Sequence, residues 1–144
     1  MGWQDYHLHV FRIGDAAYGP DPEGELGFRD EMKARLSDVA QVGTSIGYEY
    51  DFGDSWENEL LVETASTAEL GRACPACTAG EGACPPEDCG GWPGYQELKA
   101  ILANPAHKAH QEMQMWADSQ VGEKFDPASF DLPATSRRVT RALF

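Results

Sequence analysis

Four cysteines lie within sixteen residues of one another and form the densest group of potential metal ligands in the chain. Zinc prefers tetrahedral Cys and His ligation, and a C-x2-C pair lets two sulfurs reach one ion from a tight turn. Ligation would also order a segment so rich in proline and glycine that packing alone would not fold it. The spacing C-x2-C-x6-C-x4-C therefore predicts a structural zinc site on Cys74, Cys77, Cys84 and Cys89.

Three other states of these thiols fit the same spacing: free thiols, a disulfide, and redox catalysis. The redox alternative is the weakest, because a redox Cys-x-x-Cys normally opens a helix after a strand. Here the pair at 74–77 runs into Thr-Ala-Gly-Glu-Gly. In a reducing compartment, clustered cysteines are more often metal ligands than structural disulfides, so the sequence favours a metal.

Two histidines provide an alternative fourth ligand. His107 and His110 are one turn apart on an expected helix and share a face. Either could replace Cys74 or Cys77 if the helix folds back over the loop, and both could equally be surface residues of a polar helix. Two ligand sets remain open: four cysteines, or three cysteines with one histidine.

Carboxylates and a second pair of histidines suggest a different chemistry. His7 and His9 are two residues apart on an expected strand and could form half a metal site, although strand histidines without a metal are commoner. A carboxylate-lined sheet face can hold a divalent cation or a general acid/base pair, and it can also be a merely solvated face. The expected hairpin carries six such side chains, namely Glu49, Asp51, Asp54, Glu57, Glu59 and Glu63.

These groups define a rival hypothesis, a metal-dependent hydrolase or nuclease-like enzyme. It would use Asp51, Asp54, Glu87, Asp88 and a histidine around an open metal position. No phosphate-binding loop, dinucleotide fingerprint or nucleophile-elbow sequence supports another enzyme class. The sequence leans toward a protein without enzymatic activity.

The elements that position these residues follow from hydrophobic periodicity. Residues 3–13 alternate as a strand, 14–27 read as a loop, and the residues from 28 to 42 have helical spacing. The best hairpin spans 44–64, with Ile46, Tyr48, Tyr50 and Phe52 on one face of its first strand and Trp56, Leu60 and Val62 on the same face of the second. Helices are expected over 95–102 and 106–118 and at the C-terminus. The prediction is one α+β domain over 1–144, a mostly antiparallel sheet packed against helices, with a Cys/Pro/Gly-rich loop at 74–94.

Charge and hydropathy limit the classes of partner that the chain can have. The chain of 144 residues has 24 acidic and 11 basic side chains, a formal charge of −13. Binding to a phosphate backbone depends on Lys and Arg, so this charge makes nucleic-acid binding unlikely. No apolar run approaches the roughly 20 residues of a membrane span, and no signal peptide is recognisable, which predicts a cytoplasmic protein without a membrane partner.

Several separated segments resemble one family in the correct order. They are HLHVF near the start, YEYDFGDSWENELLVE, ACPPEDCGGWPGY, and the His107-x2-His110 helix followed by FDPASFDL. Together they resemble the plasmid pRiA4b ORF-3-like family, whose members are also labelled passenger proteins of the IS1096 transposable element. The resemblance implies a single α+β domain of no established activity, linked by name to plasmids and transposable elements, and it assigns no catalytic residues.

The N-terminus differs from this family pattern, in which a further strand and helix usually precede the HLH strand. Loss of an edge strand and its covering helix would expose unpaired backbone and apolar surface, which favours a homodimer. We expect a zinc-stabilised interaction domain that binds another protein or its own copy. The alternatives are the hydrolase described above and a DNA-associated accessory protein of a mobile element.

Overall fold

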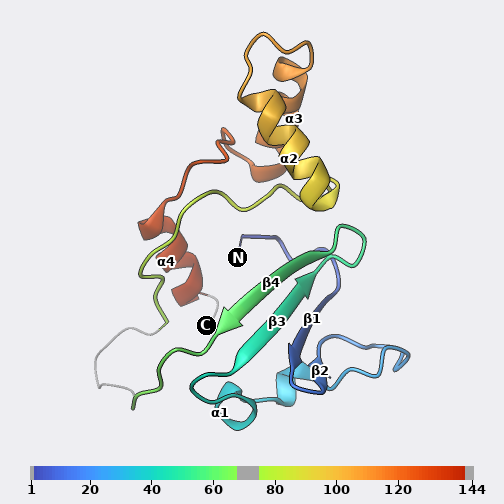
Figure 1. Ribbon diagram of the computed structural model, residues 1–144, viewed down its shortest axis with the longest axis vertical. Helices are drawn as coiled ribbons and strands as arrows, with labels where there is room; N and C mark the ends of the chain where they lie inside the picture. Colours follow the sequence, from blue (N-terminus) through green and yellow to red (C-terminus); the bar gives the residue numbers. More distant parts are fainter. Residues whose placement is uncertain (1, 68–74, 142–144) are drawn as a thin grey trace. The chain divides into compact units, whose positions relative to one another are not determined.

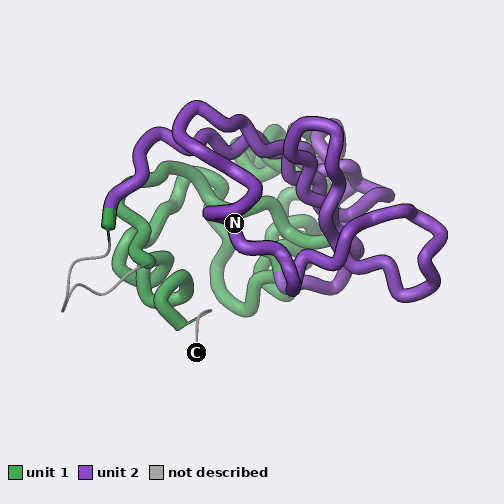
Figure 2. Tube along the Cα trace, turned by 90° about the horizontal axis from the view of Figure 1, so that it is seen from below, with its two compact units in different colours: residues 1–3, 67–87, 96–144 green, residues 4–66, 88–95 purple. Residues whose placement is uncertain are grey.

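The computed structural model describes residues 2–67 and 75–141 (Figure 1). The described chain combines a four-stranded antiparallel sheet with four α-helices, so the predicted α+β class is confirmed. It divides into two compact units, coloured separately in Figure 2. Unit 1 comprises 1–3, 67–87 and 96–144, and unit 2 comprises 4–66 and 88–95.

The sheet lies entirely in unit 2 and has the order β2-β1-β3-β4. Its strands are β1 (His9–Ile13), β2 (Ala16–Tyr18), β3 (Ser45–Tyr50) and β4 (Trp56–Leu61). Each neighbouring pair is antiparallel, as Figure 1 shows for β1, β3 and β4. The expected hairpin is therefore correct, and the first strand is shorter than the predicted 3–13.

The β3–β4 hairpin carries its predicted apolar side chains on one face. In the β3–β4 register Tyr50 lies opposite Trp56, and Ile46 lies opposite Leu60, which confirms the predicted shared face. Ile46, Tyr50 and Trp56 are buried. Tyr95 contributes the edge of its ring to Trp56, with centroids 6.1 Å apart, so aromatic contact holds the first turns of helix α2 within unit 2.

The helix expected from 28 to 42 is wrong. The structure has a 3-10 turn, η1 (Glu31–Lys33), and one α-helical turn, α1 (Leu36–Val39), separated by extended backbone at Ala34 and Arg35. Two apolar positions of the expected stripe, Met32 and Leu36, are 87% and 62% exposed. A helix this short needs a buried face to stabilise it, and these residues do not provide one.

The remaining helices are α2 (Gly91–Leu102), α3 (His110–Val121) and α4 (Leu132–Arg141). Helix α2 begins four residues before the predicted 95, and Pro93 is accommodated because the first-turn amides need no helical acceptor. Among the described residues of unit 1, the buried apolar side chains include Leu98, Ala117, Phe125 and Pro86. Across the described residues, none of the helices has the length and apolar character needed to cross a membrane.

Candidate functional site

The four predicted cysteine ligands fall in different parts of the chain. Cys74 lies outside the described residues, Cys77 and Cys84 belong to unit 1, and Cys89 belongs to unit 2. None of the three described cysteines is joined in a disulfide. The zinc site on Cys74, Cys77, Cys84 and Cys89 therefore stays a prediction.

The Cys84 thiol is protected by burial. Burial raises its pKa from the ordinary value of 9.0 to about 11. Its side chain lies directly against Gly2, where an added Cβ would come within 2.6 Å of the Cys84 Cβ. A thiol in this environment is protonated at neutral pH and is a poor nucleophile, because the thiolate is the reactive form.

We expect Cys84 to react slowly with a thiol reagent in the metal-free native protein. A pKa of about 11 in place of 9.0 strongly lowers the thiolate fraction at pH 8. The rate at Cys84 should rise with pH toward its pKa, and denaturation should abolish the difference from Cys77. Mass spectrometry after timed alkylation measures both sites, and equal native rates would contradict the buried environment of Cys84.

His107 and His110 differ in the ring atom that each leaves available. His110 Nδ1 lies 3.1 Å from the carbonyl oxygen of Ile101, which can only accept, so Nδ1 carries the proton and Nε2 keeps its lone pair. His107 Nδ1 instead accepts the backbone N–H of Ala109 at 3.2 Å. His110 is therefore the better arranged of the two predicted substitute ligands, since ligating histidines usually donate their other N–H to an oxygen.

A different group of potential ligands meets inside unit 2. His7 Nε2 lies 3.2 Å from Asp88 Oδ1 and 3.8 Å from Asp51 Oδ2. One ligand atom from each residue can be chosen so that all three lie within 4.8 Å of one another. Among the described residues no other trio of His, Cys, Asp or Glu side chains meets this criterion.

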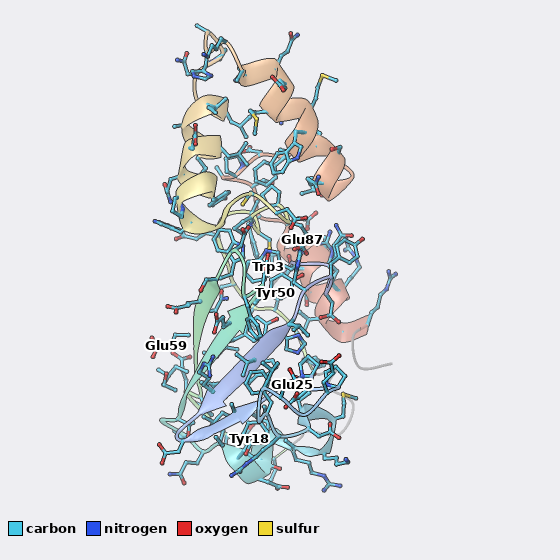
Figure 3. All side chains as sticks on the ribbon, turned by 90° about the vertical axis from the view of Figure 1, so that its right-hand side faces the viewer. Trp3, Tyr18, Glu25, Tyr50, Glu59 and Glu87 are labelled. Atoms are coloured by element: carbon cyan, nitrogen blue, oxygen red, sulfur yellow. The ribbon has the colours of Figure 1, made fainter. Side chains whose placement is uncertain are left out.

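Backbone contacts hold His7 at the end of the sheet where β3 finishes. The Asp51 N–H donates to the Leu8 carbonyl at 2.9 Å, which continues the β1–β3 ladder one step beyond the strands. The Tyr6 N–H donates to the Tyr50 hydroxyl at 3.1 Å, and the Tyr50 ring meets the His7 ring edge-on with centroids 5.9 Å apart. Tyr50, labelled in Figure 3, is 1% exposed, so the ring that contacts His7 is itself held by packing.

We expect Tyr50→Phe to lower the free energy of unfolding by about 1 kcal/mol, because the Tyr6 amide loses its acceptor while the ring packing remains. Urea denaturation measures the change. Tyr6→Phe is the matched control, since its exposed hydroxyl donates to the exposed Gln4 side chain, and it should leave stability nearly unchanged. An unchanged urea midpoint in Tyr50→Phe would contradict this role of the hydroxyl.

Asp51 is fixed by the turn that it begins. Its Oδ1 accepts the Gly53 N–H at 2.9 Å, and its carbonyl accepts the Ser55 N–H at 2.6 Å. Asp51 and Ser55 both have left-handed backbones, with φ of 56° and 53°. Asp is among the residues that tolerate this conformation, and such residues concentrate at functional sites. The turn leaves the second oxygen of a buried carboxylate directed at His7.

His9 has separate carboxylate partners. Its Nε2 lies 3.0 and 3.1 Å from the two oxygens of Glu31, and its Nδ1 lies 3.5 Å from Asp5. Strand β1 begins at His9, so His7 precedes the strand. The expected half-site on His7 and His9 is therefore not formed by the two together.

The remaining carboxylates of the hairpin mostly have local roles. Glu49 pairs with Arg12 at 3.0 Å, and Glu59 accepts the Ser45 hydroxyl at 2.6 Å. Asp54 accepts the Gly90 N–H at 3.0 Å. Of the carboxylates in the rival hypothesis, the structure brings Asp51 and Asp88 together with a histidine.

A cavity of about 380 Å³ lies elsewhere in unit 2, beside Glu31. Two of its carboxylates already have partners, since Asp21 accepts the amides of Leu26 and Phe28 and Asp30 pairs with Lys33. The His7 cluster does not line this cavity. The ligand geometry, rather than the cavity, therefore identifies the candidate site.

Sequence comparison places these segments among known proteins. The family model described as "Plasmid pRiA4b ORF-3-like protein" matches residues 1–134. "Uncharacterized protein y4hQ" of Sinorhizobium fredii (strain NBRC 101917 / NGR234) is 43% identical over 122 residues. That alignment covers 83% of this chain and 62% of the relative, so the chain spans about three fifths of the relative's length.

A solved structure has a similar fold. The crystal structure of a protein of unknown function, MM3350 from Methanosarcina mazei Go1, matches with a TM-score of 0.81 and 33% sequence identity. The match covers 94% of this chain and 76% of that chain. The segments that form the His7, Asp51 and Asp88 cluster all fall inside the range matched by the family model.

Proposed function

The chain belongs to the plasmid pRiA4b ORF-3-like family, and from this premise we propose that it binds a divalent cation through His7, Asp51 and Asp88, for metal-dependent hydrolysis. The observation that carries the proposal is the convergence of one imidazole nitrogen and two carboxylate oxygens within 4.8 Å. The three residues come from three distant segments, so sequence proximity does not explain their meeting.

The chemistry of these donors fits a divalent transition metal. Imidazole nitrogen and carboxylate oxygen both ligate Zn²⁺ at about 2.0–2.2 Å, and they also suit Mn²⁺ and Fe²⁺. Ligand atoms around one ion at such distances lie about 3–4 Å apart, which is the scale of the separations around His7. Three protein ligands with further positions open are typical of catalytic sites, whereas structural zinc sites are closed.

The three residues would contribute differently to the site. The Asp51 side chain is 11% exposed and is oriented by the Gly53 N–H, so it supplies a fixed inner ligand. The Asp88 side chain is 71% exposed and lies on the solvent side of the site. A cation with open positions supplies Lewis acidity to a substrate carbonyl or phosphoryl oxygen. The chain's own contribution is to fix the ligands and to retain an accessible side.

A metal titration tests the proposal. Calorimetry with Zn²⁺, Mn²⁺ and Mg²⁺ on the full chain should show a site that takes Mn²⁺, prefers Zn²⁺ to Mn²⁺, and binds Mg²⁺ weakly, because a nitrogen ligand favours later transition metals. Mn²⁺ separates this site from the cysteines, since thiolates are poor ligands for it. Absence of Mn²⁺ binding would overturn the proposal.

A protein-binding role is the second candidate, favoured by exposed aromatic side chains. Tyr6 and Trp92 in unit 2 are 71% and 63% exposed. Large exposed apolar groups are common at protein interfaces. The partner would be another protein or a second copy of the chain in the cytoplasm, with structural zinc at the cysteines. Light scattering measures self-association, and zinc content together with thiol titration measures the cysteine site.

A further inference from the structure

The segment that brings Asp88 to the site has an unusual backbone. Asp88, Gly90 and Gly91 all have left-handed conformations, with φ of 53°, 86° and 63°. Left-handed backbone is unfavourable for most L-residues and is tolerated by aspartate, and glycine enters it readily but loses more conformational freedom on ordering. Such a segment needs specific contacts to keep one conformation, and the position of Asp88 depends on those contacts.

Asp54 makes two contacts with this segment. Its Oδ2 accepts the Gly90 N–H at 3.0 Å. Gly91 lies so close to the Asp54 carbonyl oxygen that an added Cβ would overlap it. Both contacts belong to unit 2, and Asp54 sits in the same turn as the ligand Asp51. The turn that contains Asp51 therefore also contacts the segment that carries Asp88, through Gly90 and Gly91.

We infer that Asp54 is a positioning residue, which holds the 88–91 segment through the Gly90 amide so that Asp88 can reach the cation bound by His7 and Asp51. The inference rests on the proposed function. It assigns Asp54 a role different from a ligand: its carboxylate is directed at a backbone N–H, and it is not a member of the ligand cluster among the described residues. Mutation of a residue that orients a metal ligand typically lowers metal affinity by 10–100-fold.

Two substitutions of Asp54 distinguish a positioning residue from a metal ligand. Asp54→Ala removes the acceptor and should weaken Mn²⁺ binding by about 10–100-fold. Asp54→Asn keeps an oxygen that can accept the Gly90 N–H, so its affinity should stay within about threefold of wild type. The exposed Glu57→Gln in β4 controls for the loss of one negative charge. Equal losses in Asp54→Asn and Asp54→Ala would identify a ligand and overturn the inference, as would wild-type affinity in Asp54→Ala.

A second measurement does not depend on metal. Hydrogen exchange at the Gly90 amide, followed by NMR in the metal-free chain, should accelerate in Asp54→Ala and stay slow in Asp54→Asn. Retained chemical-shift dispersion across the sheet shows that both variants fold. If wild type fails to bind Mn²⁺, the proposed function fails by itself, and Gly90 exchange still decides whether Asp54 holds the segment. Unchanged exchange in Asp54→Ala would overturn the positioning role.

Discussion

Asp51→Asn should weaken divalent-cation binding by about a hundredfold or more, because loss of a ligand exceeds the 10–100-fold cost typical of changes outside the ligand set. The substitution removes the charge of a buried carboxylate while keeping an oxygen that can accept the Gly53 N–H. The turn should therefore survive, and the loss should be specific to the metal. Calorimetric titration with Mn²⁺ measures the dissociation constants of variant and wild type.

Two further substitutions calibrate this result. Asp88→Asn should also weaken binding, but by less, since its side chain is 71% exposed and water can replace part of its contribution. Asp15→Asn, in the turn after β1, removes the same charge from an exposed residue outside the cluster and should leave affinity unchanged. Wild-type affinity in Asp51→Asn would remove Asp51 from the site and with it the proposed ligand set.

Gly91→Ala should destabilise the protein by roughly 3 kcal/mol, the combined cost of a left-handed alanine and of overpacking against fixed backbone. Gly91 has φ of 63°, and its added Cβ would overlap the Asp54 carbonyl oxygen. Backbone at both sides of the contact leaves no flexible side chain to move aside. The free energy of unfolding from urea titration measures the effect.

Gly14→Ala is the matched control for this prediction. Gly14 has a similar φ of 56°, but an added Cβ meets nothing within 4 Å. It should cost only about 1 kcal/mol, the part due to the left-handed backbone. Equal destabilisation by the two substitutions would show that the 51–55 turn yields to the new methyl group, and would contradict a tight Gly91–Asp54 contact.

The parts of the fold that could be predicted are those with strong local periodicity. The β3–β4 hairpin has alternating aromatic residues and a tight turn, and both its strands and the shared face of Tyr50 and Trp56 are correct. The loop expected over 14–27 is wrong in part, because it contains strand β2, and Ala16–Tyr18 is too short to alternate visibly. The helix from 28 to 42 is wrong because spacing alone does not ensure that the apolar side chains find a partner, as exposed Met32 shows.

The candidate site could be predicted only in its components. The sequence identified His7, Asp51 and Asp88 as possible ligands, but nothing local to any of them selects this trio over Asp54 or Glu87. The selection depends on the β1–β3 register, which brings Leu8 to Asp51, and on the left-handed backbone of the 88–91 segment. The closely spaced cysteines gave a stronger local signal, because four ligands in one loop need no tertiary information.

The chain order of unit 2 limits how the protein could be divided. Residues 4–66 contain the whole sheet with His7 and Asp51, whereas Asp88 returns to the unit after an intervening segment assigned to unit 1. A fragment ending at Ser66 would therefore contain two of the three proposed ligands and would lack Asp88.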